Sequence, residues 1–140
     1  MKSFVSYFQE KLQFAVIEPI EIVGAGKSVA KVDTGNEAYN VLHGVEIKIK
    51  NNSVRFKTVN DSILTRPLLG DVEINIGSGN MEKRPVVQID FVIKGKKFTK
   101  PFSLADRSTN DEPILLGELF LSEIDAVVDV NLKSAAANES

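Results

Sequence analysis

The sequence lacks cysteine and tryptophan and contains a single histidine, His43. Without cysteine there are no disulfide bonds and no thiolate metal ligands. One histidine cannot form an HExxH motif or supply the several imidazoles of a typical zinc site. We therefore expect no metal site and no other cofactor, and we interpret His43 as a polar residue near a strand end.

Strong net charge and long hydrophobic runs are also missing. Seventeen basic and nineteen acidic residues give a net charge of -2, which is too weak a field to attract nucleic acid or an anionic membrane. The apolar runs fall short of the roughly 20 residues that cross a bilayer, and no secretory signal pattern is present. The expectations are no nucleic-acid partner, no membrane contact and a cytoplasmic location.

What the chain has is many short segments rich in Val, Ile and Phe, separated by Gly, Asn and Pro, a pattern typical of β-strands. Its 140 residues suit one domain. Apolar residues alternate at positions 45–49, 72–76 and 87–93, so each strand should turn one face inward. Hairpin turns are predicted at residues 50–53 and 94–96, and a longer turn at residues 77–80.

Two short helices and three regions complete the predicted organisation. In residues 1–15, Val5, Phe8 and Leu12 recur every three or four positions, which predicts an amphipathic helix. Residues 118–123 resemble one helical turn. We divide the chain into an N-terminal helix or leader (1–16), a β domain (17–133) and a polar tail (134–140).

The run Gly24-Ala25-Gly26-Lys27-Ser28 invites comparison with a phosphate-binding loop. The full pattern needs a glycine at position 21, where this chain has Glu21, and a helix afterwards. A strand-like segment follows instead. We interpret the run as a loop between strands.

The strongest motif is Asp33-Thr34-Gly35, which follows the apolar segment 29–32. Alone, this tripeptide is often only a turn. Later in the chain, however, Ile114-Leu115-Leu116-Gly117 places apolar residues before a glycine and a helical turn. The two motifs together are much rarer than either alone.

Together these motifs resemble the paired signature of retropepsin-like aspartic proteases, over residues 28–130. The segments KVDTG, RPVVQIDFVIKGKKF and LADRSTNDEPILLGELFL are most similar to a bacterial group described as ATP-dependent zinc proteases associated with the ligase RimK. The resemblance implies a mainly β fold, a small closed antiparallel β-barrel of the acid-protease type. We do not carry over ATP or zinc, because the sequence lacks both motifs.

The resemblance also implies roles for single residues. Because two nearby carboxylates share a proton and the chain has one such motif, catalysis would need Asp33 from each chain of a homodimer. Thr34 would brace the pair and Gly35 would let the two backbones approach, while Leu116 and Gly117 support the loop. A flap over the peptide or protein substrate is expected between about residues 58 and 84, with residues 71–79 the best candidate.

Some residues depart from this family pattern. Asn36-Glu37 follow the motif, where the RimK-associated group usually has Ala and then a basic or small residue, and Glu118 stands where Arg is common. If Glu37 and Glu118 faced each other they would repel, unless Lys31 or Arg107 lay between them. The alternative is therefore an inactive structural or binding module with the same fold.

The first ten residues, MKSFVSYFQE, resemble the capsid-targeting leader of tailed phages related to T4. If this leader is real, the protein is phage-encoded, has capsid or prohead proteins as partners and is located in the virion. The other interpretation is the amphipathic helix described above.

Overall fold

A computed structural model describes residues 12–35 and 39–132. The predicted mainly β class is confirmed: strands dominate these two ranges, which also contain one short α-helix and one 3-10 turn. The elements are β1 (Gln13–Phe14), β2 (Ile17–Ile22), β3 (Gly26–Val32), β4 (Asn40–His43), β5 (Val45–Lys50), β6 (Ser53–Lys57), η1 (Val59–Asp61), β7 (Ile63–Gly77), β8 (Asn80–Ile93), β9 (Lys96–Ala105), β10 (Ile114–Leu116), α2 (Glu118–Glu123) and β11 (Val127–Val128). No helix in these ranges is long and apolar enough to span a membrane.

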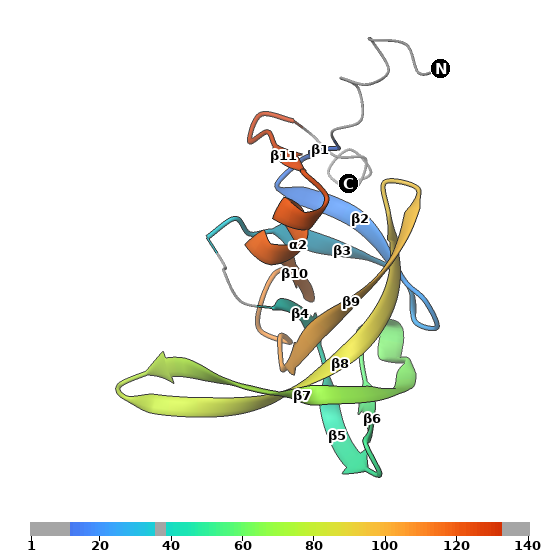
Figure 1. Cartoon of the computed structure of the whole chain (residues 1–140), viewed down its shortest axis with the longest axis vertical. Helices are drawn as coiled ribbons and strands as arrows, with labels where there is room; N and C mark the ends of the chain where they lie inside the picture. The colour runs from blue at the N-terminus through green and yellow to red at the C-terminus, as the bar shows by residue number, and fades with distance from the viewer. Residues whose placement is uncertain (1–11, 36–38, 133–140) are drawn as a thin grey trace.

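Nine strands form one sheet in the order β2-β3-β10-β4-β9-β8-β7-β6-β5 (Figure 1). Strand β2 also pairs with β8, at Glu21 with Val92 and Ile22 with Phe91, and just beyond β2 the Val23 N–H donates to the Asp90 carbonyl at 3.0 Å. The architecture is one sheet rather than the expected closed barrel, because this contact is short beside the pairings of β8 with β7 and β9. The remaining strands, β1 and β11, form a separate parallel pair.

The core lies where β2, β3, β8, β9 and β10 enclose apolar side chains. The predicted alternation in β8 is confirmed, since Val87, Ile89, Phe91 and Ile93 are all buried. Phe91 stands at the centre, with its ring 5.3–5.6 Å from the rings of three other phenylalanines. Offset and edge-on aromatic pairs of this kind stabilise a core beyond the area that they bury.

The other two alternating segments do not turn an apolar face into the core. Ile47 and Ile49 on β5 and Ile76 on β7 are exposed. β5 is the last strand of the sheet, and the outer halves of β7 and β8 project from the body as a two-stranded arm (Figure 1). Alternation shows that a strand has two faces, but tertiary structure decides which face is covered.

The turns agree with the predictions in most respects. Residues 50–53 and 93–96 close the hairpins β5–β6 and β8–β9. The turn at residues 77–80 is tighter than expected, because Gly77 pairs directly with Asn80. The run at residues 24–28 is a turn that leads into a strand, and a Cβ at Gly24 would lie 2.9 Å from Arg66 Nη2 and 3.0 Å from Leu64 Cδ2. Here glycine is required by its φ of 91° and by this close approach.

The prediction of an N-terminal helix is wrong for residues 12–15, which are the part of that segment that the structure describes. Residues 1–11 lie outside the described residues. Gln13–Phe14 form a strand beside Val127–Val128. A buried carboxylate fixes this region: Glu18 Oε2 accepts the Ala15 N–H at 2.8 Å and lies 2.9 Å from Lys94 Nζ. By contrast, the predicted helical turn at residues 118–123 is confirmed with the same bounds.

Candidate active site

Asp33 follows the last residue of β3 and is half-buried. Its backbone N–H donates to the Leu116 carbonyl at 2.9 Å, which extends the parallel pairing of β3 with β10 by one residue. Its Oδ1 accepts the Gly35 N–H at 3.2 Å. The carboxylate is therefore held in a turn at the end of a core strand, with Leu116 directly beside it.

The two sequence motifs meet because β10 lies between β3 and β4. Asn40, the first residue of β4, is buried, and its Oδ1 accepts the Gly117 N–H at 2.8 Å. This bond ties the chain just after Asp33-Thr34-Gly35 to the chain just after Leu116. Asn40 was not among the predicted site residues. Its position as a polar residue directly before the apolar pair Val41-Leu42 was the one feature of the sequence that pointed to it.

Thr34 and Gly35 lie on the exposed side of the turn. Among the described residues, a Cβ built on Gly35 would meet only Asp33 Oδ1, at 3.5 Å, which is an ordinary contact. The described part of the chain thus leaves room for a larger residue at position 35.

A cavity of about 390 Å³ adjoins the loop, lined by Thr34, Glu118, Leu121, Ser122, Asp125, Ala126 and Val128. Glu118 is the first residue of α2, and its Oε1 accepts a hydrogen bond from Ser122 Oγ at 3.0 Å. Its predicted neighbour Glu37 lies outside the described residues, so their repulsion stays a prediction.

Arg107 adds a positive charge on the same side of the molecule. The pKa of its guanidinium is lowered, mainly by burial and to a smaller extent by the charge of Arg84. The carboxylates of Glu112 and Asp33 oppose this shift and raise the pKa. The carboxylate of Asp33 is therefore within electrostatic reach of Arg107. Arg107 Nε donates to the Glu112 carbonyl at 2.8 Å, which fixes the side chain.

The loop that carries Arg107 is held by His43. The Arg107 backbone N–H donates to His43 Nδ1 at 3.0 Å. Next to it, Ser108 bonds the Asp106 carboxylate through its hydroxyl and its amide, and both bonds lower the pKa of Asp106; His43 adds a smaller effect in the same direction. His43 thus anchors a loop, which agrees with its interpretation as a polar residue at a strand end.

The family is shown by direct comparison. A model of the RimB-like family, described as retropepsin-like aspartic endopeptidase RimB, matches residues 22–139. This chain belongs to that family. The predicted retropepsin-like resemblance is confirmed, whereas neither the phage leader nor the RimK association finds support in the match.

One solved structure similar to this RimB-like chain is protein Lpg0085 from Legionella pneumophila, of unknown function. The two share 26% sequence identity with a TM-score of 0.75, over 89% of this chain and 97% of the other. No curated protein matches the chain. The similarity to Lpg0085 therefore supports the fold of this chain over most of its length, but it assigns no activity.

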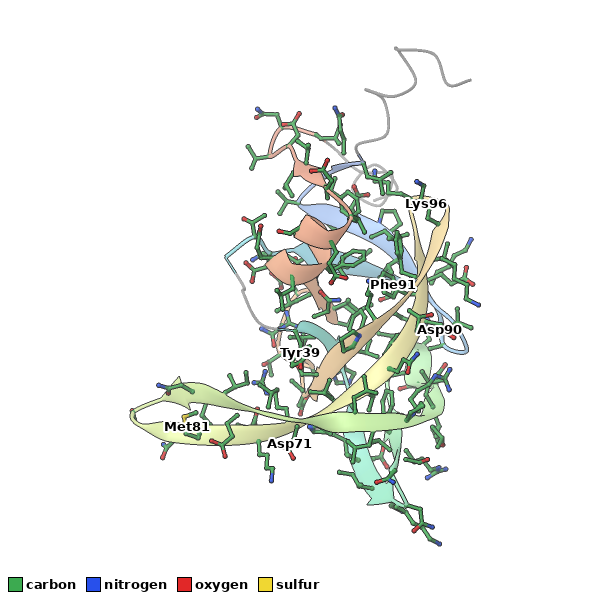
Figure 2. The ribbon with its side chains drawn as sticks, viewed as in Figure 1. Tyr39, Asp71, Met81, Asp90, Phe91 and Lys96 are labelled. Carbon is green, nitrogen blue, oxygen red and sulfur yellow. The ribbon has the colours of Figure 1, made fainter. Side chains whose placement is uncertain are left out.

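In this RimB-like chain, the expected flap region corresponds to the arm formed by the outer parts of β7 and β8. Figure 2 shows Asp71 near the base of the arm and Met81 near its end. The tip, which the sequence did not locate, is Ser78-Gly79, where both residues have positive φ. Glycine suits this two-residue turn because it adopts such angles without steric cost.

Asn40→Ala is expected to lower the free energy of unfolding by about 1–3 kcal/mol, because it leaves the buried Gly117 N–H without an acceptor. Urea unfolding followed by circular dichroism measures the change. Asn75→Ala is the matched control: Asn75 also accepts a backbone N–H, from Gly77 at 2.9 Å, but in an exposed turn. Equal losses in both variants would contradict a special role for Asn40.

Proposed function

We propose that this chain is an aspartic endopeptidase that acts as a homodimer, with a water molecule bound between the Asp33 carboxylates of two chains. The observation that carries the proposal is the position of Asp33, half-buried at the end of a core strand and bonded through its backbone to Leu116. The family match supports the same chemistry.

The reaction needs two carboxylates in different protonation states. One ionised Asp33 takes a proton from the water while the water oxygen bonds to the peptide carbonyl carbon. The protonated Asp33 of the second chain donates to the carbonyl oxygen. The C–N bond then breaks as the carboxyl that took the proton of the water passes it to the nitrogen, while the other carboxylate takes back a proton from a hydroxyl of the tetrahedral intermediate. A free carboxyl and a free amine result.

Gly35 supports the requirement for a second chain. The described residues of its own chain leave space for a Cβ, and the close approach of a partner's loop would account for its small size. The flap expected over the substrate stays a prediction; the arm is the described segment in that range.

The test is cleavage of a mixed peptide library by the wild-type protein at acidic and neutral pH, with Asp33→Asn as the control protein. We expect cleavage products, and a specific activity that falls on dilution as the dimer dissociates. Sedimentation measures the mass at the same concentrations. Absence of cleavage under all conditions would favour the inactive module instead, and full activity in a monomer would contradict a site shared by two chains.

A further inference from the structure

Several strand edges have no partner strand in the described part of the chain, and β5 and the outer part of β7 provide two of them. β5 ends the sheet and pairs only with β6. β7 pairs with β6 up to Pro67, and beyond residue 68 it pairs with β8 alone. Free edges of this kind are templates for adding another strand.

The edge of β5 has one basic face and one apolar face. Lys48 lies opposite Arg55 in the register with β6, and Lys50 is two residues further along. None of these three cations has an ion pair within the described ranges, and like charges in opposite positions are unfavourable. On the other face, Ile47 and Ile49 are 37% and 56% exposed.

The free edge of the arm has the complementary pattern. Asp71 and Glu73 lie on one face of β7, and Val72 and Ile74 lie on the other, because successive side chains alternate. Ile76 near the tip is 57% exposed. Asp71 Oδ2 lies 3.5 Å from Lys83 Nζ on β8, and within the described residues this is the one ion pair that Asp71 and Glu73 form.

There is space beside β5 for the side chains of an added strand. A cavity of about 300 Å³ is lined by Ile47 together with charged residues such as Glu46 and Arg84, and a second of the same volume by Ile49, Leu68 and Asp71. Both cavities are also lined by Lys83 and Pro85, so they form one furrow between β5 and the base of the arm.

We propose that the arm of one molecule adds as a β-strand to β5 of a second copy of this chain. Asp71 and Glu73 of the arm would then face Lys48 and Lys50, while its apolar face enters the furrow beside Ile47. The arm projects from the body, where it is accessible to another molecule (Figure 1). Two reciprocal contacts of this kind join two molecules with two-fold symmetry.

This inference rests on the proposed function only in taking a second copy as the partner. It assigns a separate contact, remote in sequence from Asp33. A competing role for Lys48 and Lys50 is protection of the β5 edge against pairing, which lysines often provide. The two roles predict opposite effects of charge reversal.

The experiment measures the dimer dissociation constant by sedimentation equilibrium in the Asp33→Asn background, so that it does not depend on catalysis. We expect Lys48→Glu/Lys50→Glu, and separately Asp71→Lys/Glu73→Lys, each to weaken association by about tenfold or more. An equimolar mixture of the two variants should recover wild-type affinity, because both contacts in the mixed dimer pair opposite charges again. High salt should weaken the wild-type dimer as well.

The matched control is Lys96→Glu/Lys97→Glu, which makes the same change of charge at exposed positions on β9; it should leave association unchanged. Unchanged or tighter association of Lys48→Glu/Lys50→Glu, or a mixture that stays weak, would overturn the arm contact. An unaffected dimer that still cleaves peptides with Asp33 present would leave the proposed function intact. A wild-type protein that stays monomeric would overturn both.

Discussion

Replacing Asp33 with Asn is expected to lower the rate of peptide cleavage by at least about 10³-fold. Asparagine cannot take up the proton of the attacking water, but it has the same shape and keeps an oxygen that accepts the Gly35 N–H. The fold and the mass of the assembly should therefore not change. Initial rates on one peptide from the library, with circular dichroism and sedimentation, measure all three properties.

Mixed dimers of wild type and Asp33→Asn test whether the loss of cleavage comes from a site that two chains share. If each dimer needs two Asp33 carboxylates, exchange between equal amounts of wild type and variant should leave about one quarter of all dimers with both, so the activity should fall to about half of its value before exchange. Wild-type protein diluted with Lys96→Glu/Lys97→Glu should lose no such activity. Cleavage by Asp33→Asn at the wild-type rate would assign the hydrolysis to other residues.

Asp33 and the segment before Gly117 could be predicted from the sequence, because each is marked by neighbouring residues in the chain. An apolar strand that ends in Asp33-Thr34-Gly35 places a carboxylate in a turn, and the apolar segment before Gly117 predicts a second core strand. Their pairing followed from family resemblance rather than from spacing. Asn40 was missed because its role depends on Gly117, 77 residues away in the sequence.

The errors in the fold have the same cause. The spacing of apolar residues in segment 1–15 favoured a helix, but Gln13–Phe14 pair with β11, more than a hundred positions along the chain. The alternation in β5 and in the arm predicted strands correctly and their burial wrongly. A periodic pattern identifies the faces of an element, whereas long-range contacts select the face that is covered.

Phe91→Ala is expected to lower the free energy of unfolding by about 3–5 kcal/mol, a large part of the stability of an ordinary domain. Phe91 is fully buried, and its ring contacts those of Phe98, Phe102 and Phe120. Removing it leaves a cavity that these rings cannot fill without moving. Thermal unfolding should show a midpoint lower by roughly 10 °C or more.

Phe98→Ala is the control, because Phe98 belongs to the same ring cluster but is only partly buried. It loses less buried area and leaves a smaller cavity, so the loss of stability should be clearly smaller. Equal losses would show that the rings act as one unit rather than through their own burial.

Phe120 belongs to α2, which begins directly after Gly117. Loosening around Phe91 should therefore also lower cleavage per folded molecule, more than Phe98→Ala does.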